Sequence, residues 1–260
     1  MFLAKGDKTL TRLATNMPSP VDPNYISDLI VLGDSKVAFS AWCFSTVFNG
    51  RGLADFASLL ALGGTSLGHA RAYYQHLVNY GYEYTFLERG RPASEINSMP
   101  VLDQPPACWE DMIATILVAE NAMWAISSGF VGGKDLQIST LIRKVGQERY
   151  FHVLYAMGWL GAFENEEKRL FGECLIRRLN SVRQWLGPAD IEDSTYAAGY
   201  RTTSNNSVHE KFEASMSKVY AVLDTPPPAR YVEPEAWDRG RRRNGTVPDG
   251  LYRKMKPREL

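Results

Sequence analysis

The chain has 260 residues, no formal net charge at pH 7, and contents of 22% charged and 12% aromatic residues. This composition is typical of a soluble globular protein, and a chain of this length can bury a sizeable core. The charge balance gives no basic excess that would indicate binding to nucleic acid or to an anionic membrane. No stretch approaches about 18 consecutive apolar residues, and the first residues contain no apolar run of signal-peptide length, so we expect a cytoplasmic protein.

The three cysteines, Cys43, Cys108 and Cys174, are widely spaced and odd in number. Their spacing predicts neither a disulfide framework nor a zinc site. Cys43 and Cys174 lie within apolar helical patterns, so we expect them to be small core residues in a reducing compartment.

The first half of the chain predicts an arm, two helices and a crossover. Residues 1–25 are polar and contain three prolines, which indicates an extended arm. A first helix is expected from Ser27 to about Phe48, with Ser27 or Asp28 as its N-cap. A second helix is expected over residues 53–80, closed by a glycine. Residues 88–107 hold four prolines and predict an irregular crossover.

The second half predicts further helices and a tail. They are expected over residues 109–128, 136–160, 166–186 and 208–223. Four long helices with a crossover after the second are the element order of a ferritin-like four-helix bundle, so the predicted fold class is all-α. The bundle is expected over residues 26–188. Residues 189–260 are expected to supply a C-terminal helix and an extended docking tail.

Each long helix carries a polar interruption in its apolar stripe, on the side expected to face the core. The interruptions are Lys36 in the first helix, Ser66 and His69 in the second, Glu120 in the third, and Glu148 with His152 in the fourth. Burying an acid costs several kcal/mol unless it is paired. We therefore expect one shared internal polar site, with Arg149 as a second cation or at its edge.

Each of these residues also has an explanation without a shared site. An inward histidine such as His69 is usually a hydrogen-bonded core residue. Glu120 taken alone is compatible with a subunit interface, and Lys36 with a side chain that extends to the end of the bundle.

The ligand pattern of a ferritin-like di-metal centre is incomplete in this sequence. Such centres use a Glu from each of two helices and Glu-x-x-His from each of the other two. Ser66 and Arg149 stand three residues before the two histidines, where glutamates would be needed. Lys36 stands in the first helix, and a protonated lysine has no lone pair for a metal.

We therefore expect no metal and no cofactor in this chain, and no catalytic residue. The ammonium of Lys36 is expected to neutralise both Glu120 and Glu148 in place of an ion. If a metal is nevertheless bound, its ligands would come from the carboxylates and imidazoles, which are His69, Glu120, Glu148 and His152.

Several short motifs resemble one known family. They are Leu-Gly-Asp at 32–34, Ala-Trp-Cys at 41–43, Leu-Gly-His-Ala-Arg at 67–71, and Glu-Arg-Tyr-Phe-His at 148–152 with Trp159. In these motifs the chain is similar to the ferritin-like subunits of phenylacetate-CoA monooxygenase (epoxidase), over about residues 26–188. The tail, with residues 200–205 and Trp237, more closely resembles the extension of the catalytic subunit.

The resemblance implies a choice between two subunit types. The catalytic subunit of that family holds a di-iron site and epoxidises the ring of an aryl-CoA ester, whereas the structural subunit has lost its metal and serves as a scaffold. His69, Glu120 and His152 match the ligand positions. Ser66, Arg149 and Lys36 depart from them, so this chain is more similar to the structural subunit.

The favoured hypothesis is a non-catalytic subunit of a bacterial multicomponent oxygenase that acts on aromatic CoA-thioesters or related aromatic acids. It would form a hetero-oligomer with a metal-bearing ferritin-like paralogue, which would hold any CoA-thioester substrate. One alternative is an iron-dependent oxygenase with a rearranged His/Glu site, and another is a helical assembly protein. The basic run 239–243 indicates a solvated or subunit-docking tail and not a nucleic-acid site.

Overall fold

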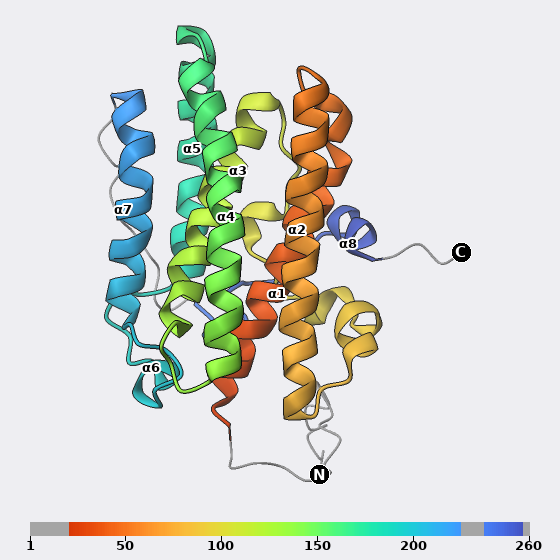
Figure 1. The fold of residues 1–260 in the computed structure, drawn as a ribbon, viewed down its shortest axis with the longest axis vertical. Helices are drawn as coiled ribbons and strands as arrows, with labels where there is room; N and C mark the ends of the chain where they lie inside the picture. Colours follow the sequence, from red (N-terminus) through yellow and green to blue (C-terminus); the bar gives the residue numbers. More distant parts are fainter. Residues whose placement is uncertain (1–20, 225–236, 257–260) are drawn as a thin grey trace, which may run out of the picture.

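The computed structural model describes residues 21–224 and 237–256, and within these ranges the regular elements are helices with no strand. Four long helices lie side by side as a bundle (Figure 1). They are α1 (Pro23–Ser45), α2 (Leu53–Leu77), α3 (Trp109–Ser127) and α4 (Leu136–Ala162). The predicted all-α, ferritin-like bundle is confirmed.

Helix α3 is the central element of the structure. The additional helices α5 (Asn165–Leu186) and α7 (Asn205–Leu223) pack against it, and α1 and α4 cover its other sides. The segment Trp109–Phe130, with mean hydropathy 1.3, is long and apolar enough to cross a membrane by length and composition alone. In the bundle 89% of its apolar window is buried, as in the core helix of a soluble protein.

The crossover between α2 and α3 is irregular, as predicted. It contains only short turns, which are η3 (Phe86–Gly90), η4 (Ala93–Glu95) and η5 (Pro100–Leu102). Its anchor is the buried carboxylate of Asp34 in α1, which accepts hydrogen bonds from the Tyr74 hydroxyl at 2.6 Å and from Arg91 Nη1 at 3.0 Å. The backbone N–H of Asn97 also donates to Asp34, at 2.6 Å. One acid thus fixes the crossover against both α1 and α2.

The first helix begins earlier than predicted. Asp22 is the N-cap, its side chain accepts from Asn24 N at 3.0 Å, and Pro23 occupies the first turn, where its missing N–H costs nothing. Ser27 and Asp28 are therefore inside α1. The predicted arm of residues 1–25 is correspondingly shorter, and residues 1–20 lie outside the described part of the chain.

Three other helix ends show ordinary capping. The second helix is extended by the turn η2 (Val78–Tyr80) and ends at Gly81 in the left-handed conformation, with φ 85°. Asp135 caps α4, and a reciprocal Glu164–Glu167 capping box starts α5. The short helix α6 (Ser194–Ala197) precedes α7, which starts at Asn205.

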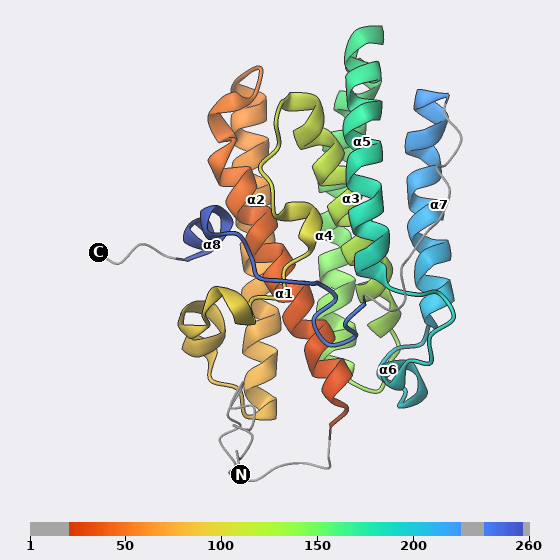
Figure 2. The same ribbon diagram turned by 180° about the vertical axis from the view of Figure 1, so that it is seen from behind.

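The C-terminal segment 237–256 crosses α1 and ends in α8 (Asp249–Met255) (Figure 2). Arg239 Nη1 lies 2.8 Å and Arg242 Nε 3.1 Å from the same oxygen of Asp28, and Arg243 Nη2 lies 2.9 Å from Asp103 Oδ2. The prediction that this basic run is solvated or docks a partner subunit is therefore wrong for these three arginines. They neutralise acids of this chain's own bundle.

Candidate functional site

The centre of the bundle holds an ion pair between α1 and α3. Lys36 Nζ donates to both carboxylate oxygens of Glu120, at 2.7 Å and 2.8 Å. The two residues are only 2% and 1% exposed. An ammonium that binds both oxygens compensates for the hydration that the carboxylate loses on burial.

Helix α4 adds an imidazole to this pair. His152 Nδ1 lies 2.9 Å from Glu120 Oε1, and His152 is itself buried. Burial alone would raise the pKa of Glu120, but the charge of Lys36 and the hydrogen bond with His152 outweigh it and hold the pKa well below its usual range. Glu120 is therefore a carboxylate at neutral pH. We call Lys36, Glu120 and His152 the central cluster.

Two neutral side chains border the central cluster. Burial, followed by the negative charge of Glu120, raises the pKa of the Tyr73 hydroxyl and of the Cys43 thiol. Both groups therefore stay protonated at neutral pH, and the negative charge remains on Glu120.

The other predicted histidine forms a separate pair. His69 Nε2 lies 2.5 Å from Glu148 Oε2, and the side chain of Glu148 is 36% exposed. Burial, and then the charge of Lys36, lowers the pKa of His69 to about 4, so the ring is neutral at pH 7 and Nε2–H donates to Glu148. Its Nδ1 and the Ser66 hydroxyl are buried without a hydrogen-bond partner among the described residues.

The structure thus divides the predicted single site into two. Lys36 was expected to neutralise both acids, yet the contacts of Glu148 are with His69 and, at 3.8 Å, with Lys144. Glu148 lies one turn before His152 on α4, toward the exposed edge that faces α2. A partly hydrated carboxylate at that edge does not require the buried ammonium.

Arg149 contacts α3 through a backbone carbonyl and an amide side chain, and not through the carboxylate of Glu120. Its Nε donates to the Glu120 carbonyl oxygen at 3.2 Å, and its Nη2 donates to Asn121 Oδ1. The guanidinium also lies 5.5 Å from the ring centroid of Trp124. Sequence reasoning did not single out Asn121, although a buried amide next to Glu120 on an apolar helix is itself a signal.

Two further carboxylates, also not singled out from the sequence, fasten α4 to its neighbours. Asp55 Oδ1, at the start of α2, accepts from the Tyr155 hydroxyl at 2.7 Å. At the opposite end, Asp135 Oδ2 accepts from the hydroxyls of Tyr25 at 2.6 Å and Tyr80 at 2.7 Å. These contacts lie on opposite sides of the central cluster along the bundle axis, and they fix the axial position of α4 relative to α1 and α2.

The residues at the centre do not fit a di-metal site. Lys36 binds both oxygens of Glu120, and Ser66 and Arg149 supply no carboxylate. Within the described ranges, no three or more His, Cys, Asp or Glu side chains group closely enough to hold a metal ion. The arrangement is an internal hydrogen-bonding network centred on Glu120, with the His69–Glu148 pair beside it.

Comparison with known proteins gives one family. The family model described as phenylacetic acid catabolic protein matches residues 16–244. The comparison with curated proteins found no match. The matched range includes the whole bundle, with His69 and His152, and the arginines that pair with Asp28.

Proposed function

Because the chain belongs to the phenylacetic acid catabolic protein family, we propose that it is a non-catalytic, ferritin-like subunit of a bacterial multicomponent oxygenase. The complex acts in the cytoplasm on aromatic CoA-thioesters or related aromatic acids, and this subunit carries no cofactor. The observation that supports this role is the hydrogen bonding of Lys36 Nζ to both oxygens of Glu120, where the ligand pattern of a metal site would need a free carboxylate.

The central cluster explains how such a bundle holds its remaining acid without iron. In a metal-bearing bundle the ions neutralise inward carboxylates. Here a covalently attached amine supplies the charge, and His152 makes a further hydrogen bond with Oε1 of Glu120. The fold of this subunit is therefore independent of the iron supply.

Metal analysis tests this proposal. The chain purified from iron-supplemented cells is expected to contain far less than one iron per chain. The matched positive control is the triple variant Lys36→Glu/Ser66→Glu/Arg149→Glu, which restores the missing acids. When this variant is folded, it is expected to bind iron. Stoichiometric iron in the natural chain, with spectral bands of a coordinated iron centre, would overturn the proposal.

The outer face of α2 and α4 is the surface we assign to the metal-bearing partner. Phe151 and Leu154 on α4 are 65% and 52% exposed, and Leu60 on α2 is 41% exposed. The Asp55–Tyr155 contact lies near their level and brings the two helices together there. Large apolar side chains in a group on a surface are typical of protein interfaces.

Co-expression with a ferritin-like chain of the same organism that carries the complete Glu and Glu-x-x-His set tests this face. The two chains are expected to co-purify. Phe151→Glu is expected to separate them, because it places a charge in the apolar contact. Ile176→Glu, at a position on α5 that is 50% exposed, serves as the control and is expected to leave the complex intact. Equal effects of the two variants would contradict the assigned face.

A further inference from the structure

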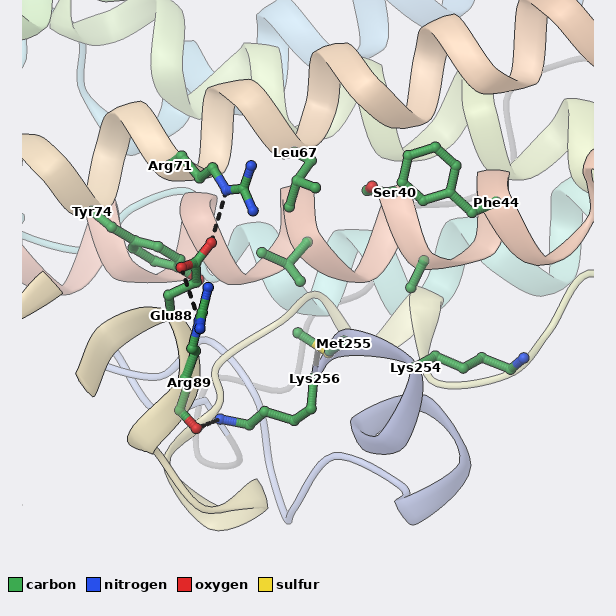
Figure 3. Close-up of a pocket in the computed structure, with 12 residues that line it drawn as sticks. Ser40, Phe44, Leu67, Arg71, Tyr74, Glu88, Arg89, Lys254, Met255 and Lys256 are labelled. Atoms are coloured by element: carbon green, nitrogen blue, oxygen red, sulfur yellow. Dashed lines mark hydrogen bonds and ion pairs between the residues drawn. The ribbon is translucent and has the colours of Figure 1, made fainter. Parts of the chain in front are cut away.

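A cavity of about 170 Å³ lies on the side of the bundle where α8 meets α1 and α2 (Figure 3). Its apolar surface comes from three separate parts of the chain. Val37, Ala41 and Phe44 belong to α1, Leu67 to α2, and Met255 to α8. The C-terminal helix therefore forms one wall of a cavity whose floor is the α1–α2 groove.

The rim of this cavity carries four cations and one acid. Arg71 Nε lies 2.7 Å and Arg89 Nε 3.4 Å from the carboxylate of Glu88, so two guanidinium groups share one negative charge. Lys254 and Lys256 make their described hydrogen bonds with neutral oxygens, those of the Ser45 hydroxyl and the Arg89 carbonyl. The rim therefore carries three positive charges that its own acid does not balance.

The cations are not distributed evenly around the cavity. In Figure 3 the side chains of Arg71 and Arg89 lie at Glu88, and the Lys256 ammonium lies at the Arg89 carbonyl oxygen, whereas Lys254 points away from this end. Burial, followed by the positive charge of Arg91, lowers the pKa of Lys256, while the charge of Asp34 opposes this shift. The cavity thus has a cationic end beside Glu88 and an apolar floor that extends toward Phe44.

This asymmetry decides which ligand fits. An inorganic anion would use the cationic end and leave the apolar floor hydrated. A neutral hydrocarbon would use the floor and leave the charges uncompensated. We propose that the cavity binds an organic carboxylate, with its charged group near Arg89 and Lys256 and its apolar body along the floor. This site is separate from the central cluster and does not depend on the proposed oxygenase role.

Calorimetric titration with three probes tests the ligand class. Octanoate has a carboxylate and an apolar chain, acetate has only the carboxylate, and octanol has only the chain. Octanoate is expected to bind one per chain and more tightly than either of the others, with roughly fourfold tighter Kd for each methylene that enters the floor. Raised ionic strength is expected to weaken octanoate binding.

Paired variants test the location. Arg89→Gln with Lys256→Gln is expected to weaken octanoate binding about tenfold, because two charge-assisted contacts are lost. Arg253→Gln with Lys218→Gln makes the same change in net charge at exposed positions outside the cavity lining and is expected to leave Kd unchanged. Phe44→Ser is expected to weaken octanoate and to leave acetate unaffected.

Four results would overturn the proposal. They are no octanoate binding up to its solubility limit, equal affinity for acetate and octanoate, equal affinity for octanol and octanoate, and equal effects of the two paired variants. The last result would mean that octanoate responds to net charge alone. All titrations use the full chain, with circular dichroism to confirm that each variant is folded.

Discussion

Glu120 is the residue on which the charge of the interior depends. It is 1% exposed and contacts Lys36 from α1 and His152 from α4. A buried ion pair adds little net stability compared with apolar residues of the same volume, whereas a buried charge without its partner is costly. The pair therefore matters mainly through what happens when one member is removed.

Lys36→Met tests this asymmetry. The substitution leaves Glu120 without its cation, so we expect a loss of about 3–5 kcal/mol in the free energy of unfolding at pH 7, measured by urea denaturation. The double variant Lys36→Met/Glu120→Leu is the control and is expected to recover most of that loss, because it leaves no unpaired charge. A single variant as stable as the natural chain would contradict the central cluster.

The pair of His69 and Glu148, outside the central cluster, is expected to make the free energy of unfolding depend on pH. The folded-state pKa of His69 is lowered to about 4, below the value of about 6.5 in the unfolded chain. Between these values the unfolded state binds more protons, so the contribution of His69 is fully present above pH about 6.5 and is lost as the pH falls toward 4. We expect a loss of up to about 3 kcal/mol over this window.

His69→Gln isolates this contribution, because an amide can still donate to Glu148 but does not titrate. The difference in unfolding free energy between the natural chain and this variant is expected to change between pH 7 and pH 4. A difference that is constant over this range would refute the neutral, buried state of His69.

Helical periodicity predicted the central cluster but not its limits. Lys36, Glu120 and His152 share the inward side of their helices, and a period of 3.6 residues is sufficient to reveal that. Glu148 was assigned to the same site because it lies one turn from His152. Periodicity does not report how deeply a side chain at the edge of an apolar stripe is buried. Glu148 lies at such an edge, and its hydrogen-bond partner is His69.

At the scale of the elements, helix ends were predictable where capping chemistry is local. Gly81 terminates the second helix as expected. The start of α1 was misplaced because two acids, Asp22 and Asp28, both suit an N-cap, and only the earlier one precedes a proline. The helix α8 was not predicted, since seven residues in a proline- and arginine-rich tail give little periodic signal.

Substitution by alanine is expected to have opposite effects on stability at two glycines. A Cβ at Gly133, between α3 and α4, would lie 2.0 Å from the carbonyl oxygen of Tyr200, so Gly133→Ala forces backbone movement and is expected to cost about 1–3 kcal/mol. A Cβ at Gly158 within α4 meets open space, and Gly158→Ala is expected to add up to about 1 kcal/mol through helix propensity. Thermal unfolding of both variants measures the signs, and a shared sign would contradict this geometry.

At the scale of the whole molecule, the C-terminal segment is part of the bundle. Arg239 reaches Asp28 across 211 positions of sequence, and Arg242, which is 1% exposed, binds the same acid. Composition alone indicated a solvated basic run because nothing local in the sequence identifies so distant a partner. The partner of these arginines is Asp28, a buried acid about one turn inside the first helix.

Asp28→Asn tests this attachment. Burial alone would raise the pKa of Asp28, but Arg239 and Arg242 hold it well below its usual range, so the acid is charged at pH 7 and the variant removes that charge. Since Arg242 then remains buried without its carboxylate, we expect a loss of about 3–5 kcal/mol in unfolding free energy. We also expect segment 237–256 to detach, so that trypsin cleaves after its arginines at a concentration that leaves the natural chain intact.

Asp190→Asn makes the same chemical change at an exposed position and is expected to alter stability by less than about 0.5 kcal/mol and to leave the cleavage pattern unchanged. Mass spectrometry of the fragments identifies the cut sites. If Asp28→Asn loses stability while the tail remains protected, then α8 and its contacts with α1 hold the segment, and the arginines only neutralise Asp28. If both measurements are unchanged, the buried arginines do not attach the tail.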